Sequence, residues 1–495
     1  MTESGSTPVT QSGRRPTAKG AGTRTRRPSR AAAVEHLTPA ESAAKGKVER
    51  AEIGRSALGE WTAPSDRRDP VDLLEEQAAS RVPELIPIRY GRMLVSAFAF
   101  YRGAAYVMAS DLAGLPRTGL QVQLCGDAHL SNFGIYAASD RRLVFSVNDF
   151  DETLPGPFEW DLKRLVASFA VAGRDRAFNA KQRQRINRSV TRAYCTAMKE
   201  FAGMDTLDQW YARLEVDQVA DALRRQGRKK QVKQLDTTTA KAQSKTSLKA
   251  FSKLTHLVGG EPRIVSDPPT IVPVAELAQP GETKALDDFL HGLVRSYRQT
   301  LSGDRRRLLE RFRYTDAARK VVGVGSVGTR AWIVLLLGSR GDPLFLQVKE
   351  AQRSVLESFL GNSAFSSHGQ RVVEGQLLTQ ATSDIMLGWL RETGVDGVER
   401  DFYVRQLWDS KGSVDVTAMN PKGMETYAHA CGWALAKAHA RSGDAIAIDS
   451  YLGSSDALDQ ALAGFAEAYA DQNQNDYEAL EAAVASGRVK AETGV

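Results

Sequence analysis

The fold of this chain is decided by residues 125–161, which read CGDAHLSNFGIYAASDRRLVFSVNDFDETLPGPFEWD. Two short apolar runs, residues 122–125 and 143–147, each lead directly into polar residues of this stretch. The pattern predicts two strands, each followed by a loop. Because loops held by a sheet can bring polar side chains to one point, we expect a functional site here.

Four polar side chains follow the two predicted strands and form a candidate metal site. Asp127 and Asn132 lie in the first loop, and Asp149 and Asp151 lie in the second. Carboxylates that lie close together repel one another unless a cation sits between them. Hard oxygen ligands suit Mg²⁺, which commonly shares its shell with substrate phosphates. The alternative is a solvated Asp-rich and Asn-rich turn, but the spacing Asp-x-x-x-x-Asn, strand, Asp is more regular than turns require.

These motifs resemble those of the aminoglycoside and choline phosphotransferases, small-molecule relatives of the protein kinases. Residues 126–132, GDAHLSN, resemble their catalytic loop Gly-Asp-x-His-x-x-Asn, and residues 147–152, VNDFDE, are similar to their metal-binding segment. The resemblance implies a catalytic role for Asp127 and metal binding by Asn132 and Asp149. Asp151 is an additional candidate metal ligand.

A third motif and two departures refine the resemblance. Residues 160–165, WDLKRL, resemble the buried Tyr-Asp-Leu of those enzymes, which implies that Asp161 accepts backbone N–H groups from the catalytic loop. Asp151 replaces the Gly of the protein-kinase motif Asp-Phe-Gly, which favours the small-molecule branch. Cys125 stands where the motif usually has His, so the structural hydrogen bond of that His must be replaced or lost.

From residue 88 onward the chain also resembles a bacterial family known as domain of unknown function 2252. The similarity lies in the segments SAFAFYRG, GDAHLSNFG, NDFDETLPGPFEWDLKRL and VGVGSVGTR. This resemblance covers most of the chain but implies no established substrate.

A glycine-rich turn and a lysine strand occur much later in the sequence. The turn lies between two β-rich runs and contains Gly323, Gly325, Ser326 and Gly328. Glycines there let backbone N–H groups approach a phosphate closely. The turn also fits an ordinary hairpin, whereas a P-loop is disfavoured because its Lys is absent and a strand follows. Lys349 ends the next apolar run, FLQVK, and resembles the kinase Lys that contacts the α- and β-phosphates of ATP.

A lysine of this kind needs a carboxylate that holds it in place. Glu374, in a predicted helix over residues 369–380, is the leading candidate for this ion pair, and Glu350 and Glu357 are alternatives. Residues 402–407 are predicted to form a strand that leads into a hinge beside the adenine. Residues 427–440 are predicted to form a helix similar to the one that precedes the phosphotransferase catalytic loop.

The order of these parts differs from that of kinases, in which the glycine-rich loop and the Lys precede the catalytic Asp. We therefore predict an α+β, two-lobed protein-kinase-like fold that is circularly permuted, which is tolerated where termini lie close together. This fold requires the helix that ends near His439 to pack against the strand that enters Gly126. The competing explanation is that half of the resemblance is accidental.

The predicted organisation has four parts. Residues 1–62 are a disordered basic tail, residues 63–310 a helical catalytic lobe, residues 311–420 a β-rich nucleotide-binding lobe, and residues 421–495 helices that return to the catalytic lobe. The first 30 residues hold seven Arg or Lys and one Glu, so they carry +6 of the net charge of +7. Such a tail cannot bury enough apolar surface to order itself. It is either a solubilising extension or a weak contact for nucleic acid or acidic partners.

Composition indicates the cellular compartment in which the protein is expected. The three cysteines, Cys125, Cys195 and Cys431, are widely spaced, which fits a reducing cytoplasm and no zinc site. No apolar stretch approaches the length of a membrane span, and no secretory signal is recognised. We therefore expect a cytoplasmic protein with no membrane contact.

Two basic features allow two interpretations each. Arg102, in the predicted helix over residues 86–112, either reaches a phosphate or lies on the helix surface. The basic run of residues 224–253 is either a solvated loop or frayed helix, or a flap that guides phosphates.

The function that these expectations support is ATP- and Mg²⁺-dependent phosphoryl transfer to a small-molecule hydroxyl. Asp127, Lys349 and Glu374 would be the catalytic residues, while the glycine-rich turn would grip the triphosphate. A nucleotide-binding pseudokinase and an AMP-transferring enzyme on the same fold are alternatives. A metal-dependent phosphoesterase is disfavoured because the histidines of the chain form no Asn-His or His-x-His cluster.

Overall fold

The computed structural model places six antiparallel strands in one sheet, in the order β12-β13-β11-β10-β9-β8. The structure describes residues 36–494 apart from 226, 278–282, 322 and 395. The strands of the large sheet are β8 (Ile271–Pro273), β9 (Phe312–Lys320), β10 (Ala331–Gly338), β11 (Pro343–Ala351), β12 (Gly388–Thr393) and β13 (Glu399–Gln406).

The central strands of this sheet are buried because both of its faces are covered. Every residue of β10 and β11 is buried. Successive side chains of a strand point to opposite faces. Leu344 and Leu346 accordingly pack in one apolar cluster with helix α13 (Thr283–Thr300), while Phe345 packs in another with helix α11 (Ser247–Leu254). This two-sided burial explains why residues 343–348, which precede Lys349, are mostly apolar instead of alternating between apolar and polar.

The smaller strands bring the two polar loops together. Strand β1 (Gln121–Leu124) pairs with β4 (Leu154–Pro157), and β2 (Phe133–Ala137) forms a hairpin with β3 (Leu143–Val147). The two strands predicted from the apolar runs at residues 122–125 and 143–147, β1 and β3, are therefore not paired with each other. The first loop joins β1 to β2, and the second joins β3 to β4. Because β1 pairs with β4 and β2 pairs with β3, both loops cross between the same two strand pairs and therefore lie side by side. Strands β5 (Leu214–Glu215) and β14 (Gly412–Ser413) flank the hairpin, and β6 (Thr255–Val258) pairs with β7 (Glu261–Ile264).

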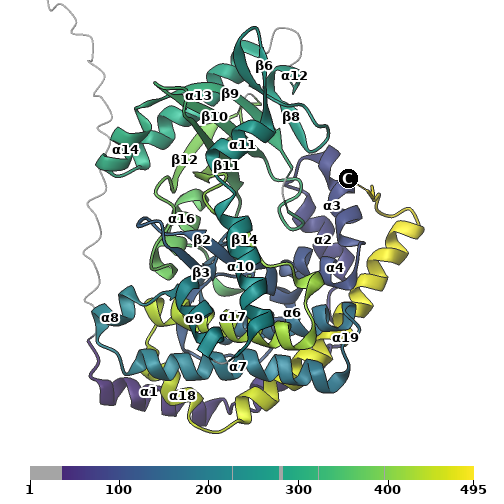
Figure 1. The fold of residues 1–495 in the computed structure, drawn as a ribbon. Coiled ribbons are helices and arrows are strands. Elements are labelled where there is room, and N and C mark those ends of the chain that lie inside the picture. The colour runs from purple at the N-terminus through teal and green to yellow at the C-terminus, as the bar shows by residue number, and fades with distance from the viewer. Residues whose placement is uncertain (1–35, 226, 278–282, 322, 395, 495) are drawn as a thin grey trace, which may run out of the picture. The chain divides into compact units, whose positions relative to one another are not determined.

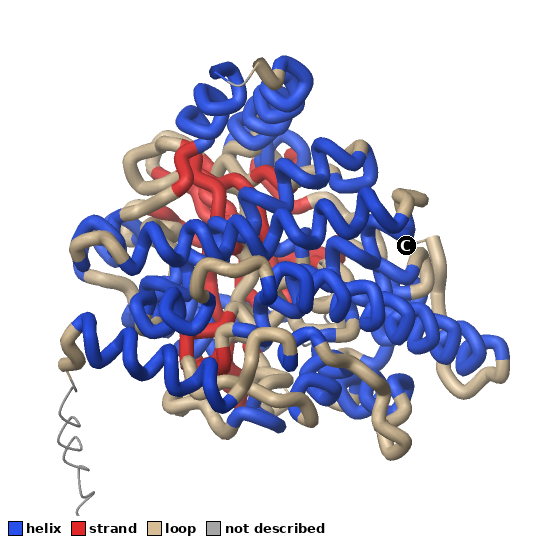
Figure 2. Tube along the Cα trace, turned by 90° about the horizontal axis from the view of Figure 1, so that it is seen from below, coloured by secondary structure: helices blue, strands red, loops and turns tan. Residues whose placement is uncertain are grey.

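Helices surround the strands, as Figure 2 shows. The remaining helices are α1 (Pro39–Glu52), α2 (Pro70–Ala78), α3 (Ile86–Met93), α4 (Ala97–Gly103), α5 (Ala105–Ala113), α6 (Glu159–Asp175), α7 (Ala180–Ala202), α8 (Thr206–Tyr211), α9 (Val216–Arg225), α10 (Lys229–Gln243), α12 (Val274–Leu277), α14 (Gly303–Leu309), α15 (Glu357–Leu360), α16 (His368–Thr379), α17 (Pro421–Ser442), α18 (Ala445–Leu452) and α19 (Ala457–Ala485). Four 3₁₀ turns complete the described elements: η1 (Ala57–Gly59), η2 (Pro83–Leu85), η3 (Leu130–Asn132) and η4 (Val416–Ala418).

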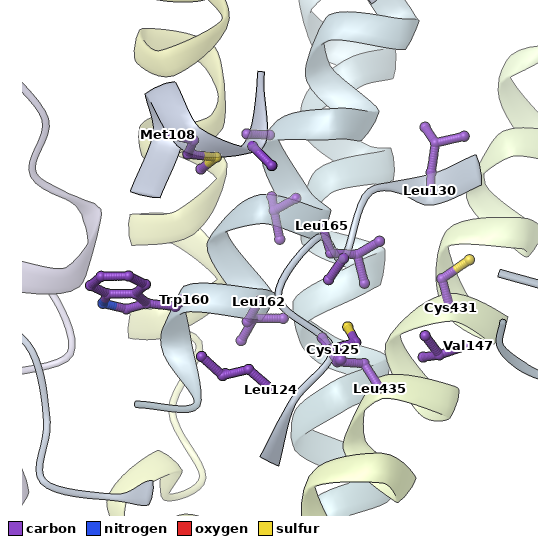
Figure 3. Packing of buried hydrophobic residues seen from close by; sticks show 14 of the residues in the cluster. Met108, Leu124, Cys125, Leu130, Val147, Trp160, Leu162, Leu165, Cys431 and Leu435 are labelled. Carbon is purple, nitrogen blue, oxygen red and sulfur yellow. The ribbon is translucent and has the colours of Figure 1, made fainter. Parts of the chain in front are cut away.

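The C-terminal helices pack against the part of the chain that carries the 125–161 stretch. Helix α17 lies along α7 and contacts β1 and β3, and α19 packs on α6 and α7 (Figure 1). In the buried core, Cys125 at the end of β1 lies near Leu162 of α6 and Leu435 of α17 (Figure 3). The expected packing of the helix that ends near His439 against the strand that enters Gly126 is therefore confirmed.

Several expected boundaries differ from the structure. The basic tail was expected to extend through residue 62, but Pro39–Glu52 form α1, which packs on α18. The chain divides into Met1–Thr38 and Pro39–Val495, and most of the basic tail lies outside the described residues. The sheet begins at Ile271 rather than after residue 310, because β8 pairs with β9. The basic run of residues 224–253 is largely helical. Among the described residues, no helix is long and apolar enough to span a membrane.

Candidate active site

Asp161 holds the loop that carries Asp127. Its carboxylate accepts the backbone N–H groups of Cys125 at 2.7 Å and Gly126 at 3.0 Å, as the sequence predicted. Gly126 has a φ of +84°, and a Cβ there would lie 2.2 Å from the carbonyl oxygen of Glu152, so only glycine fits this turn. The loop is thus fixed to the first turn of α6.

His439 of α17 and Cys125 both contact the carboxylate of Asp161. Its Nε2 lies 3.3 Å from Asp161 Oδ2, and its Nδ1 lies 2.9 Å from the hydroxyl of Tyr194. The Cys125 thiol donates to the same Asp161 oxygen at 3.0 Å. A residue that is distant in sequence therefore hydrogen-bonds the carboxylate that holds the loop.

Asp127 faces the cleft and is held by a buried arginine. Arg164 Nε donates to Asp127 Oδ1 at 2.8 Å, and the amide nitrogen of Asn132 donates to the Asp127 carbonyl at 2.8 Å. His129 accepts the Ser131 N–H on Nδ1, and its Nε2 lies 3.7 Å from Asp127 Oδ2. Burial raises the pKa of Asp127, and the Arg164 guanidinium opposes this shift.

Lys349 and Asp151 form an ion pair between segments that lie 198 residues apart in sequence. The Tyr403 hydroxyl donates to Asp151 Oδ1 at 2.8 Å, and Ser326 of the glycine-rich turn donates to Asp151 Oδ2 at 3.3 Å. Asp149, two residues earlier, accepts the Asp151 backbone N–H at 3.3 Å. The structure therefore brings the Lys strand, the glycine-rich turn and the polar loops to one place.

Burial and charge act in opposite directions on this pair. Burial alone would lower the pKa of Lys349, but Asp151, Tyr403 and Asp149 together outweigh it, so the pKa of Lys349 is raised. Burial would raise the pKa of Asp151, but Lys349 lowers it. The pKa of Asp149 is raised by burial and by the charge of Asp151. Lys349 and Asp151 thus stabilise each other in their charged forms.

A cleft of about 360 Å³ opens beside these residues. Gly323, Gly325 and Ser326 line it, whereas Gly328 packs against the Arg81 side chain and lies outside it. Lys349 lies behind Asp151 and does not line the cleft. Its other walls are the polar loops, helices α2, α4 and α5, and the segment that follows β11; the polar residues among them are Glu76, Gln77, Ser80, Arg81, Arg102, Tyr106, Asp127, His129, Asn132, Asp149, Asp151, Glu152, Glu350, Gln352, Arg353, Ser354 and Ser358.

The expected ion pair between Lys349 and Glu374 is not formed. Within the described part of the chain, the ion-pair partner of Lys349 is Asp151, and Glu374 is half-buried on α16 away from the cleft lining. The same helix approaches the site with Arg371, whose guanidinium donates to the carbonyls of Asp151, Thr153 and Gln352 at 2.8–2.9 Å. Helix α16 therefore binds backbone carbonyls through Arg371 and makes no ion pair with Lys349 among the described residues.

The two alternative carboxylates also have other partners. Glu350 pairs with Arg330 at 3.4 Å and Arg400 at 3.8 Å. Glu357 lies 3.6 Å from Arg353 Nε and 3.8 Å from Arg371 Nε.

The donor set fits a Mg²⁺ ion that shares its shell with phosphate. Asp149 presents a carboxylate at the cleft, and Asn132 uses its amide nitrogen internally, which leaves its amide oxygen to contact a cation. Asp151 is engaged by Lys349. Among the described residues no cluster of three His, Cys, Asp or Glu side chains could hold a metal by itself. Mg²⁺ retains waters and needs only one or two protein carboxylates.

Three residues of this site were missed by the sequence reasoning. Arg164 lies three residues after Asp161 on α6, so it shares a face with a residue already singled out. Tyr403 lies opposite Lys349 on the neighbouring strand β13. Arg371 is a buried arginine in a helix that was predicted correctly. Only Arg164 had a signal in the sequence, namely its helical spacing from Asp161.

The fold and the cleft define a mixed helix-and-sheet protein in which a buried Lys–Asp pair adjoins a polar cleft under a glycine-rich turn. More particularly, the chain belongs to the family described as "Uncharacterized protein conserved in bacteria (DUF2252)", whose model matches residues 81–483. This match confirms the family resemblance noted in the sequence. No curated protein and no solved structure was found to match the chain.

Proposed function

We propose that this protein binds Mg²⁺-ATP in the cleft and transfers the γ-phosphate to the hydroxyl of a small molecule. The observation that carries the proposal is the Lys349–Asp151 ion pair, formed beside Asp127 and Asp149 and touched by Ser326 of the glycine-rich turn. This combination supplies positioning and charge neutralisation, which phosphoryl transfer needs more than covalent chemistry.

In the proposed reaction, the acceptor oxygen bonds to the γ-phosphorus while the bond to the β,γ-bridging oxygen breaks. ADP leaves with that electron pair, and Asp127 takes the hydroxyl proton. A carboxylate whose pKa is raised by burial is a better base than an exposed one. Arg164 keeps Asp127 oriented, and Lys349 would hold Asp151 at the cleft and supply positive charge beside the phosphates. Asn132 and Asp149 would hold Mg²⁺, which supplies neutralisation of phosphate charge.

We also propose that the fold is a circularly permuted protein-kinase-like fold. Its support is the packing of α17 on β1 and the meeting of the glycine-rich turn with the loop of Asp149 and Asp151, which precedes it in sequence. The cleft volume of about 360 Å³ favours a small acceptor over a polypeptide.

The test measures binding first and transfer second. The melting temperature of the purified protein should rise with ATP only when Mg²⁺ is present, because a ligand that binds the native state stabilises it. ATP labelled on the γ-phosphate, incubated with pools of small hydroxyl compounds, should yield a labelled product. Transfer of label from the α-phosphate would support the AMP-transferring alternative, and binding without turnover would support a pseudokinase.

A further inference from the structure

The side chain of Arg102 occupies a position in the cleft that the proposed reaction does not yet explain. Arg102 lies near the end of α4 and lines the cleft together with Asp127 and Asp149. Its carbonyl oxygen is 3.3 Å from the place where a Cβ on Gly325 would stand. Arg102 therefore lies directly beside the glycine-rich turn, on the side of the helices.

The guanidinium of Arg102 has no partner among the residues that the structure describes. Its Nε is buried without a hydrogen bond, and neither an ion pair nor another side-chain hydrogen bond of Arg102 is formed within this part of the chain. By contrast, Arg164 donates to both Asp127 and the Tyr101 carbonyl at 2.8 Å. A buried arginine with a purely structural role normally has hydrogen-bond partners for its guanidinium, as Arg164 does.

This arrangement is unfavourable for the ligand-free protein. Burial lowers the pKa of Arg102, and the charges of Asp127 and Asp149 compensate only in part and without direct contact. A buried polar group without a hydrogen bond costs free energy that an incoming anion can recover. The planar guanidinium also matches phosphate oxygens with two parallel hydrogen bonds.

The geometry points to Arg102 as the residue that binds the terminal phosphate of the nucleotide and so distinguishes ATP from ADP. This inference rests on the proposed function. Lys349 reaches the site from the sheet, behind Asp151, whereas Arg102 reaches it from the helices, beside Asp127. The phosphate that is transferred must lie next to Asp127, so Arg102 contacts this phosphate, while the positive charge of Lys349 acts from behind Asp151 on the phosphates that leave with ADP.

The test compares the affinities of Mg²⁺-ATP and Mg²⁺-ADP by calorimetry in three proteins: wild type, Arg102→Met and Arg176→Met. Arg176 is an exposed arginine just after α6, outside the cleft lining, so it controls for the loss of one positive charge. Arg102→Met should weaken ATP binding by about 10- to 100-fold, the loss typical of a charge-assisted hydrogen bond, while ADP binding changes little. Arg176→Met should leave both affinities as in the wild type.

Other results would overturn the inference. Equal losses for ATP and ADP, or no loss for either, would show that Arg102 does not contact the terminal phosphate. Failure of the wild type to bind either nucleotide would overturn the proposed function and this inference together. The melting temperature of ligand-free Arg102→Met should equal or exceed that of the wild type, because the substitution removes a half-buried charge whose buried Nε has no hydrogen bond. A lower value would indicate that Arg102 is structural, and Arg102→Lys would then be expected to restore stability.

Discussion

At the residue scale, the site depends on a few ion pairs whose members come from distant segments. Asp127 is paired with the buried Arg164, and Asp151 is paired with Lys349. Removing one partner of a buried pair leaves the other charge uncompensated, at a cost of about 3–5 kcal/mol. Substitutions at these positions therefore change stability as well as chemistry, and the choice of replacement decides which effect is measured.

Asp127→Asn should lower turnover by about 10²- to 10⁴-fold, the usual contribution of a general base. The carboxamide keeps the volume of the side chain and can still accept a hydrogen bond from Arg164. The measurement is the steady-state rate with γ-labelled ATP once an acceptor has been found. From sequence alone, Asp127→Ala is expected to abolish turnover with little loss of folding, but the Arg164 pair indicates that alanine also destabilises the protein. Unchanged turnover in the Asn variant would refute the role of Asp127.

Lys349→Met should abolish the Mg²⁺-ATP-dependent rise in melting temperature, because it removes the ammonium group proposed to hold Asp151 and to neutralise phosphate charge. Glu374→Gln is the matched control. The sequence assigned Glu374 to this lysine, whereas the structure pairs Lys349 with Asp151, so the control should respond to ATP like the wild type. A response lost in Glu374→Gln but kept in Lys349→Met would contradict the assignment made from the structure.

At the element scale, periodicity predicted which segments form helices and strands better than it predicted which side chains meet. The strand at Leu143–Val147 and the helix at residues 369–380 were located to within a residue, because apolar spacing reports burial directly. The ion-pair partner of Lys349 was not predicted, because several carboxylates lie in plausible segments and only the three-dimensional arrangement selects Asp151. The pairing of β1 with β4 was missed for the same reason. Strand pairing depends on contacts between distant residues, which local patterns do not contain.

Helix α17 provides a pH-dependent test of its own packing. Lys437 is buried, and its side-chain nitrogen donates to the Thr379 carbonyl at 3.1 Å. Burial, with a further contribution from Arg441, lowers its pKa from 10.5 to about 6. Between these two values the unfolded chain binds a proton that the folded protein does not, so this group makes stability rise with pH.

Lys437→Met should therefore be more stable than the wild type near pH 6, and the difference should shrink by up to about 1.4 kcal/mol per pH unit as the pH rises toward 9. Chemical denaturation of both proteins at several pH values measures this difference, and the titration of all other groups cancels. A difference that does not depend on pH would show that Lys437 keeps its proton in the folded protein.

At the scale of the whole molecule, the end of the chain supports the wall of the cleft. Arg488 pairs with Glu75 of α2 at 2.6 Å, and the Glu492 N–H donates to the Pro87 carbonyl of α3 at 2.9 Å. Between these helices, the Val82 N–H donates to the Gly328 carbonyl at 2.8 Å. Residues after α19 thus brace the helices on which the glycine-rich turn rests.

Removal of residues 488–495 should lower the free energy of unfolding by about 2 kcal/mol, chiefly because the buried Val489 is lost. Hydrogen exchange should rise in residues 70–93, and Mg²⁺-ATP should bind more weakly. Arg488→Met is the control for the ion pairs alone, and it should have little effect because those pairs are exposed. Unchanged exchange in residues 70–93 after the truncation would show that this bracing is unimportant.

The position of His439 has a consequence for protein synthesis. The loop that carries Asp127 is translated before α17, so its Asp161 anchor gains the His439 contact only after 278 further residues have been translated. Contacts that are so distant in sequence form slowly. We therefore expect nascent chains and prematurely terminated products to contain the motif without a working site, and the full-length protein to be exposed to chaperones and proteases during an extended interval before assembly.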